Sequence, residues 1–249
     1  RKNKQSNWTT FESDTSQVEE TQTVLEHEFE PTRLFKRTRR LPIMRLPPHK
    51  ACGVGNDIYG ISRFELAKLV KPVLDQIGIM WFLDGGTLLG AYRNGKQIPH
   101  DDDFDIAAYL PTFDDEDLTA MHRKIAALLP DPYQIRAVTS YARKLEIFDA
   151  TSDTFELPPQ YGGADFHTVT VDIQIMTDAS DGVAYLHDML GHVRIPQNAI
   201  APIGEITYEG QPFNCPRNIV LFLEAQYGYI GVDAVYDPQT KRYVKAVRC

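Results

Sequence analysis

Four aspartates crowd into five positions of this chain, at residues 101–105. Like charges at this spacing repel one another, and aspartate is disfavoured in strands. If the segment is extended, Asp103 and Asp105 point to one face. Phe104 and Ile106 then point to the opposite face, toward a core. A solvated acidic loop is the alternative, but such a loop does not anchor apolar residues on its other face. The pattern therefore favours a strand that carries paired carboxylates.

These carboxylates need a partner that offsets their repulsion, and a divalent cation is the simplest candidate. Two carboxylates about 7 Å apart on one strand face can hold a hard, oxygen-preferring ion such as Mg²⁺ or Mn²⁺. A third ligand is available in residues 168–175, where Asp172 lies among threonines and a glutamine that alternate with valines and isoleucines. If this second strand lies beside the first, Asp172 lies next to Asp103 and Asp105. On the residues alone, Asp172 is equally consistent with the surface of an edge strand.

Three carboxylates on adjacent strands are typical of two-metal sites for phosphoryl or nucleotidyl transfer. In such sites the metals stabilise the transferred group and activate the incoming hydroxyl, and a spare carboxylate accepts the proton.

A glycine pair precedes the aspartates, directly after an apolar segment that we expect to form a buried strand at residues 79–83. A strand that ends in Gly85 and Gly86 and opens a short helix presents free backbone amides to an anion. Thr87 can donate its hydroxyl to such an anion, and Arg93 can neutralise phosphate oxygens. A glycine pair alone usually marks a turn. Its place between a buried strand and the carboxylates favours a phosphate-binding loop.

Helical and strand periodicities are interleaved along the chain, which predicts a mixed α and β fold. A capping box at residues 62–65 predicts that the first helix begins at Ser62, and Gly78 ends that helix. The last helix is expected to begin at Pro216, in the first helical position, and to end near Gly228. The remaining elements are a helix at residues 87–92, a helix at 114–129, strands at 104–109 and 168–176, and hairpins at 133–148 and around residues 209–210.

Composition supports a globular domain with an atypical N-terminal arm. The 249 residues are 43% hydrophobic and 24% charged, which suffices for a core. Residues 1–30 hold seven acidic side chains and residues 31–50 hold seven basic ones and no acid. We expect residues 1–50 to form a disordered or stem-like arm and residues 51–249 to form one catalytic domain.

The charge balance bears on partners. The net charge of −8 lacks the basic field of a nonspecific nucleic-acid binder. The basic half of the arm can attract nucleic acid or anionic lipid, but a solvated stem is the favoured interpretation. The longest apolar stretch, residues 77–83, is too short to cross a bilayer. Because the chain begins with Arg1, we expect a fragment or a processed form, with any membrane anchor upstream.

Other polar residues give weaker indications. The three cysteines form no C-x-x-C pair, which leaves a Cys52–Cys215 bridge and three free thiols both open. Lys144 lies on an expected strand, where alternating charge on an exposed surface is the default interpretation. A structural role is the favoured interpretation for His187 and His192, which lack carboxylate partners at metal-binding spacing. Tyr227 and Tyr229 are expected to pack in the core rather than to stack on a base or a sugar.

Residues 82–106 resemble the signature of the LicD family, which includes fukutin and fukutin-related protein. That signature contains Gly-Gly-Thr-Leu-Leu-Gly, an arginine, and then Ile-Pro-Trp-Asp-Asp-Asp-Ile-Asp-Ile. His100 replaces the commoner tryptophan, a modest departure that leaves the carboxylate spacing intact. The resemblance covers residues 61 to about 231, and the arm lies outside it.

The resemblance implies a nucleotidyltransferase-type fold of the polymerase-β kind, which makes the fold class α+β, with a mixed β-sheet flanked by helices. It implies that Asp103 and Asp105 form the metal-binding pair, with Asp172 as a further ligand. The other site residues that it implies are Asp101 in the acidic segment, Gly85, Gly86 and Thr87 in the donor-phosphate loop, and Arg93 after that loop.

Members of this family move a phospho-group, such as phosphocholine or ribitol phosphate, from a cytidine diphosphate donor to a glycan hydroxyl. The resemblance therefore implies a phosphotransferase that depends on Mg²⁺ or Mn²⁺, with a nucleotide-diphosphate-linked donor and a glycan or glycoconjugate acceptor. The alternatives are a nucleotidyltransferase that leaves the nucleotide on its acceptor and a non-catalytic glycan- or nucleotide-binding domain. Analogy with fukutin implies the Golgi lumen, whereas a bacterial-type relative would be cytoplasmic.

Overall fold

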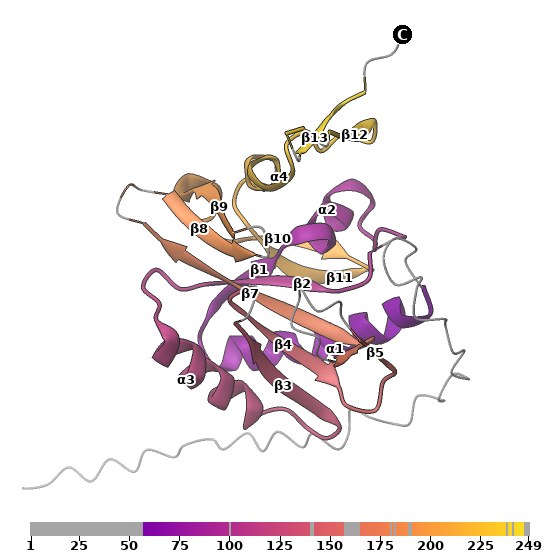
Figure 1. Cartoon of the computed structure of the whole chain (residues 1–249), viewed down its shortest axis with the longest axis vertical. Coiled ribbons are helices and arrows are strands. Elements are labelled where there is room, and N and C mark those ends of the chain that lie inside the picture. The colour runs from indigo at the N-terminus through magenta and orange to yellow at the C-terminus, as the bar shows by residue number, and fades with distance from the viewer. Residues whose placement is uncertain are drawn as a thin grey trace, which may run out of the picture. The chain divides into compact units, whose positions relative to one another are not determined.

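The fold was analysed in a computed structural model (Figure 1). The residues that the structure describes are 57–99, 101–139, 142–156, 165–179, 181, 183–188, 191–237, 239–240 and 242–246. All of them belong to one compact unit, residues 43–249. The predicted arm, Cys52 and His100 lie outside the described residues.

A mixed β-sheet lies at the centre of the fold, in the order β1-β2-β7-β4-β3, with β8 and β9 continuing from β7 (Figure 1). The strands β2 and β7 are parallel, and the other neighbours in the sheet are antiparallel. Its strands are β1 (Met80–Leu83), β2 (Asp105–Tyr109), β3 (Tyr133–Val138), β4 (Lys144–Asp149), β7 (Thr170–Asp178), β8 (Val183–Asp188) and β9 (Gly191–Pro196).

Four α-helices and three two-stranded sheets surround this sheet in the described part of the chain. The helices are α1 (Asp57–Gln76), α2 (Gly85–Asn94), α3 (Asp115–Ala126) and α4 (Ile219–Tyr227), with a 3₁₀ turn η3 (Gln197–Ala199). The short strand pairs are β5 (Thr154–Glu156) with β6 (Asp165–His167), β10 (Gly204–Tyr208) with β11 (Gln211–Cys215), and β12 (Ala234–Asp237) with β13 (Arg242–Lys245). The predicted mixed sheet flanked by helices is confirmed.

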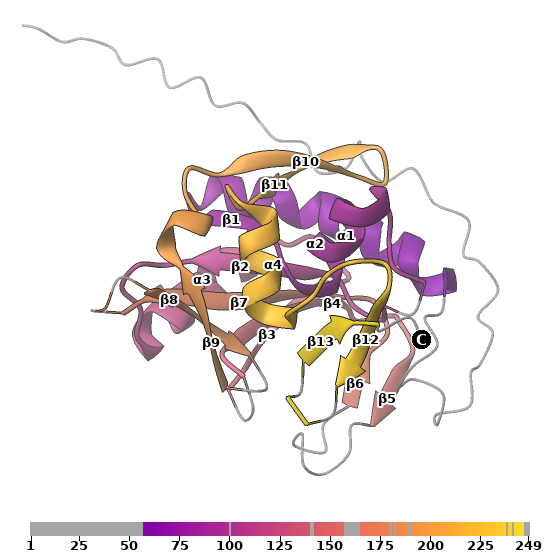
Figure 2. The same cartoon turned by 90° about the horizontal axis from the view of Figure 1, so that it is seen from above.

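The helices contact different parts of the sheet. Helix α3 contacts β3 and α1 contacts β7 and β1. Helices α2 and α4 contact each other, with α2 against β2 and α4 against β9 (Figure 1). Figure 2 shows that α4 is followed by the hairpin β12–β13, and an isolated bridge joins Gly228 to Tyr243. The bridge holds the hairpin against the C-terminal end of α4.

Helix α1 begins earlier than the capping-box pattern predicted. It starts at Asp57, so Ser62 lies inside it and the predicted start is wrong. The preceding turn is held by tertiary contacts, because the Tyr59 hydroxyl donates to Asp153 at 3.0 Å. Arg63 is buried and its Nε donates to the Thr168 carbonyl at 3.0 Å. These contacts extend the helix beyond the local sequence signal.

Helix α4 begins later than predicted. Its first residue is Ile219, and the Asn218 side chain accepts a hydrogen bond from the Leu221 amide, so the predicted start at Pro216 is wrong. The amides of Arg217 and Asn218 donate instead to carbonyls of the preceding turn, residues 199–200. The backbone amides there are thus engaged elsewhere before the asparagine cap begins the helix. The predicted end is confirmed, since Gly228 is the C-cap.

The core contains the apolar faces of the central strands. Ile173 and Ile106 are fully buried, and Phe104 packs edge-on against Tyr208 at 5.5 Å. Cys215 is buried with a free thiol. Among the described residues, no helix combines the length and the apolar character needed to cross a membrane.

Candidate functional site

Three carboxylates from two neighbouring strands converge at one end of the sheet. Asp105 opens β2 and lies opposite Asp172 of β7 in the parallel register. Together with Asp103, each offers a carboxylate oxygen, and these oxygens all lie within 4.8 Å of one another. The predicted juxtaposition is confirmed, and Asp172 lies on a central strand, not on an exposed edge.

Alternation of side chains places this acidic cluster, Asp103, Asp105 and Asp172. Phe104 is 2% exposed and Ile106 is fully buried, so the intervening aspartates project from the opposite face. The Asp172 amide donates to the Phe104 carbonyl at 2.8 Å, which ties the segment before β2 to β7. Apolar anchoring thus offsets the repulsion that gathering the carboxylates entails.

The start of α2 is built against these carboxylates. Gly85 has φ of +54°, and a Cβ there would lie 2.3 Å from Asp105 Oδ2. A Cβ at Gly86 would lie 2.6 Å from both Asp101 oxygens. The helix N-terminus is the positive end of its dipole, so it stabilises the nearby negative charge. Glycine is required here for close approach as well as for the positive φ.

Thr87 holds the start of β2 in place. Its side chain is fully buried, and its Oγ1 accepts a hydrogen bond from the Asp105 amide at 2.9 Å. A second tie joins the Asp84 amide to the Asp105 carbonyl at 3.1 Å. The Thr87 oxygen is therefore engaged by β2 as an acceptor, and the predicted role of Thr87 in the donor-phosphate loop stays a prediction.

Crowding of the carboxylates disfavours their ionisation. Burial raises the pKa of Asp103 well above its usual range, and repulsion from Asp101 and Asp172 raises it further. Burial also raises the pKa of Asp105 well above its usual range, with added repulsion from Asp103 and Asp101. A bound divalent cation would reverse this by offsetting the negative charge.

The ligand chemistry of the acidic cluster fits such a cation. Asp172 is 5% exposed, and its Oδ2 accepts a hydrogen bond from Lys144. Its buried Oδ1 has no hydrogen-bond partner among the described residues. A buried carboxylate oxygen without a hydrogen-bond partner indicates a place for a ligand. Because the acidic cluster offers only carboxylate oxygens, it suits Mg²⁺ or Mn²⁺.

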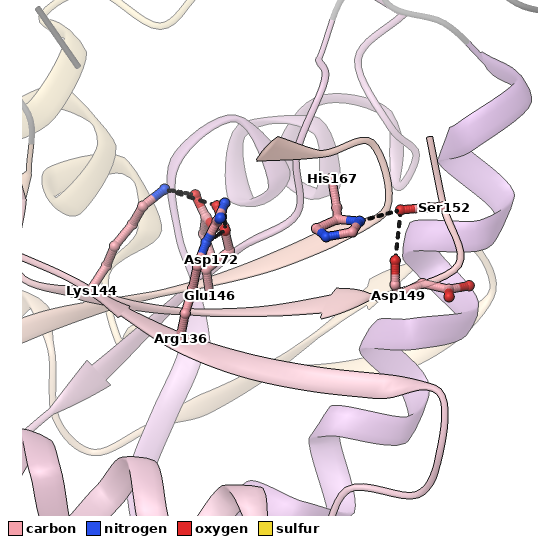
Figure 3. A network of polar contacts seen from close by, with 7 residues as sticks. All are labelled: Arg136, Lys144, Glu146, Asp149, Ser152, His167 and Asp172. Atoms are coloured by element: carbon pink, nitrogen blue, oxygen red, sulfur yellow. Dashed lines mark hydrogen bonds and ion pairs between the residues drawn. The ribbon is translucent and has the colours of Figure 1, made fainter. Parts of the chain in front are cut away.

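Behind Asp172 lies a buried charged network that the sequence did not reveal (Figure 3). Lys144 is only 7% exposed and pairs with Asp172, so its expected place on an exposed strand is wrong. Glu146 is 2% exposed and pairs with Arg136 on β3. Burial and the Asp172 charge raise the pKa of Glu146 to about 7, although Lys144 and Arg136 oppose the shift.

A second missed residue is Asp84, which lies between β1 and α2 as the N-cap of the helix. It is 1% exposed, and Gln226 of α4 donates to its Oδ1 at 2.6 Å. The carboxylate thereby links α4 to the start of α2 behind the acidic cluster. In the sequence, only its place directly before the glycine pair marked Asp84. That place did not show whether its side chain caps α2 or is buried and hydrogen-bonded to α4.

A cleft of about 400 Å³ opens on the acidic cluster. Its lining includes Gly86, Asp101, Asp103 and Asp105. The lining residues from the end of α4 and the chain after it, here called the opposite wall, are Tyr227, Tyr229, Ile230, Gly231, Val232, Ala234 and Tyr243.

The structure refines the predictions for the residues that line this cleft. Tyr227 packs against the core, as predicted, and also lines the cleft. Tyr229 lines the cleft as well. Burial and the nearby carboxylates raise the pKa of Tyr227 well above its usual range. Arg93 also lines the cleft, but its Nε and Nη2 donate to the carbonyls of Ile230 and Gly231 at 2.9–3.2 Å. Its observed contacts therefore hold the opposite wall in place.

The structural role that the sequence predicts for His187 and His192 stays a prediction. The side chains of His187 and His192 lie outside the part of the chain that the structure describes, as do Cys52 and His100.

Comparison with known proteins finds partial matches to this chain. The chain is 48% identical to the ribitol 5-phosphate transferase FKRP of Mus musculus and of Homo sapiens over 46 residues. That segment is 18% of this chain and 9% of each relative. A solved structure of ANT(2'')-Ia in complex with adenylyl-2''-tobramycin shows 17% identity and a TM-score of 0.37, over 63% of this chain and 69% of that one.

A family model covers more than half of the chain. The model is described as LicD/FKTN/FKRP, nucleotidyltransferase domain, and it matches residues 78–218. This range begins before β1 and ends at the cap of α4, so it includes the glycine pair and all the acidic residues of the site. The chain therefore belongs to the LicD/FKTN/FKRP family.

Proposed function

We propose that this chain is a metal-dependent phosphotransferase that moves a phospho-group from a nucleotide-diphosphate-linked donor to a hydroxyl of a glycan or glycoconjugate. The observation that carries the proposal is the convergence of Asp103, Asp105 and Asp172 beside the glycine-led start of α2. Membership of the LicD/FKTN/FKRP family supports the reaction class. The name of the FKRP relatives supports a polyol phosphate as one candidate group.

The acidic cluster would hold Mg²⁺ or Mn²⁺. When bound, the cation supplies Lewis-acid stabilisation of the charge on the transferred phosphoryl and on the leaving group. The chain's own contribution is to present three carboxylates from a rigid sheet, so that little reorganisation accompanies binding.

The start of α2 would hold the donor phosphates. Backbone amides at Gly85, Gly86 and Thr87 lie at the positive end of the helix, where they would donate hydrogen bonds to the donor diphosphate. Anchored there, the donor would have its reacting phosphorus next to the acidic cluster.

The transfer itself is a displacement at phosphorus. The acceptor oxygen forms a bond to the phosphorus that carries the transferred group, and the bond from that phosphorus to the bridging oxygen breaks. The nucleoside monophosphate leaves with the electron pair. We assign the hydroxyl proton to Asp101, which lines the cleft and lies against Gly86 without belonging to the acidic cluster.

The opposite wall of the cleft would hold the nucleoside. Aromatic rings bind bases by stacking, and Tyr227, Tyr229 and Tyr243 supply three such rings among the residues that line the cleft. We propose a cytidine diphosphate-linked donor on the strength of the family resemblance. The Golgi lumen remains the predicted location.

A thermal-shift panel tests the donor. CDP-, UDP-, GDP- and ADP-linked compounds are compared with and without Mn²⁺, on the wild type and on Asp103→Asn, with Asp115→Asn on the exposed start of α3 as the matched control. A ligand at about 100 times its Kd adds about 2.7 kcal/mol of stability. We expect a Mn²⁺-dependent shift with CDP-linked donors in the wild type and the control, and none in Asp103→Asn.

Mass analysis of the product tests the reaction. A glycan acceptor heavier by a phospho-substituent supports phosphotransfer, and an acceptor heavier by a whole nucleotide establishes nucleotidyl transfer instead. Retained turnover in both Asp103→Asn and Asp105→Asn would refute a catalytic acidic cluster. Donor binding without any product would favour a binding domain.

A further inference from the structure

Lys144 lies inside the buried network that joins β3, β4 and β7 (Figure 3). Its ammonium group forms an ion pair with Asp172 Oδ2 and lies 3.9 Å from Glu146 Oε1. The three side chains are only 8%, 6% and 2% exposed. Charges this well desolvated interact strongly, and each requires a partner.

The register of the strands determines which basic side chain pairs with which carboxylate. Glu146 lies directly opposite Asp172 across β4 and β7, and directly opposite Arg136 across β3 and β4. Arg136 pairs with Glu146 and lies over the ring of Phe166, 4.0 Å from its centroid. With Arg136 held on Glu146, the hydrogen bond of Lys144 goes to Asp172.

The two oxygens of Asp172 are therefore not equivalent. Lys144 holds Oδ2, whereas Oδ1 is buried and accepts no hydrogen bond from the described residues. We propose that Lys144 is a positioning residue for the metal centre, which fixes the Asp172 carboxylate so that only Oδ1 faces the cation. The inference rests on the proposed function, because it requires a cation at the acidic cluster.

The effect of removing Lys144 on cation affinity has opposite directions for two possible roles of this residue. A positive charge beside a cation site weakens cation binding by repulsion, so loss of the charge alone would tighten binding. Loss of a positioning contact weakens binding instead, typically 10- to 100-fold for partners of metal ligands. The direction of change in Mn²⁺ affinity is therefore diagnostic.

A purely structural role is tested by a charge-balanced variant. Lys144→Met alone leaves the two buried carboxylates of Glu146 and Asp172 with one cationic partner, the partly exposed Arg136, and this imbalance can affect folding. Lys144→Met combined with Glu146→Gln removes one charge of each sign. If Lys144 only balances Glu146, this double variant restores the affinity of the wild type.

The experiment measures Mn²⁺ affinity directly, by the electron paramagnetic resonance signal of the free ion, on the whole chain. The variants are Lys144→Met, Lys144→Met/Glu146→Gln, Asp172→Asn, Asp172→Asn/Lys144→Met and Asp103→Asn. Lys124→Met, on the exposed surface of α3, serves as the charge-matched control. Circular dichroism establishes which variants are folded, and the charge-balanced variant stands in if Lys144→Met is not.

We expect the Kd for Mn²⁺ to rise 10- to 100-fold in Lys144→Met and in Lys144→Met/Glu146→Gln, and to stay unchanged in Lys124→Met. In the Asp172→Asn background, Lys144→Met should change the Kd by less than about two-fold, because the positioned group is gone.

Unchanged or tighter binding in the charge-balanced variant, beside weakened binding in Asp103→Asn, would overturn the role of Lys144 and leave the metal centre standing. A full additional loss in the Asp172→Asn background would also overturn it. A wild type that binds no Mn²⁺ would refute the metal centre itself, and this inference with it.

Discussion

Asp105 and Asp172 lie opposite each other on two parallel strands, and their carboxylates meet at one end of the sheet. The two strands, β2 and β7, are direct neighbours in the central sheet although they lie far apart in the chain. Their aspartates therefore lie together, and helix α2, which begins with the glycine pair, starts beside these carboxylates.

Stability of the metal-free protein should fall as the pH rises from about 4.5 to 7. Glu146 has a folded pKa of about 7 against an ordinary 4.5, and Asp103 and Asp105 are raised in the same direction. The folded state therefore binds more protons than the unfolded state over this range, and ionisation favours unfolding. Urea unfolding at several pH values in EDTA measures the slope.

Mn²⁺ should reverse that trend, since a bound cation favours the ionised carboxylates. Asp103→Asn should flatten the slope in EDTA. If the free energy of unfolding in EDTA rises steadily with pH across this range, the raised pKa values assigned to the buried carboxyl groups are contradicted.

Gly85→Ala should weaken Mn²⁺ binding at least about ten-fold, because its Cβ would displace the Asp105 carboxylate. Gly210→Ala is the matched control, since Gly210 also has a positive φ but its Cβ would meet no described residue within 4 Å beyond its chain neighbours. Both variants should lose about 1–2 kcal/mol of unfolding free energy through backbone strain. Isothermal titration with Mn²⁺ separates them, and equal affinities would refute the close approach at Gly85.

Thr87→Val should lower the unfolding free energy by about 1–3 kcal/mol, because the Asp105 amide loses its acceptor in a buried place. Thr87→Ser keeps the oxygen and should retain most of the stability and the Mn²⁺ affinity. Chemical denaturation of both variants checks this. If valine and serine behave alike, the hydrogen bond does not hold β2 in place.

Arg93→Met should raise KM for the donor more than it lowers kcat. The arginine holds the carbonyls of Ile230 and Gly231, so its loss would loosen the wall that we assign to the nucleoside. Steady-state kinetics with a CDP-linked donor measures the two effects. A fall in kcat at constant KM would instead place Arg93 at the transferred phosphate.

Much of the site was predictable because its residues follow simple periodicities. Alternation with Phe104 and Ile106 predicted which way the first aspartates point, and alternation in β7 predicted the side of Asp172. The glycine pair was found by its position between a strand and the acidic segment.

The remaining features depend on contacts between distant segments. The network of Arg136, Lys144, Glu146 and Asp172 arises from the register of three strands, which no local pattern encodes. The opposite wall of the cleft, with its three tyrosines, forms because a hairpin near the C-terminus pairs with the end of α4 (Figure 2). Start signals for helices also failed where tertiary hydrogen bonds, such as that of Tyr59, competed with local caps.

The most direct test of the central claim is anomalous diffraction from crystals of the chain grown with Mn²⁺. The account predicts a manganese peak in contact with the carboxylates of Asp103, Asp105 and Asp172, with Oδ1 as the ligand atom of Asp172. Absence of a peak at the three carboxylates under saturating Mn²⁺ would contradict it.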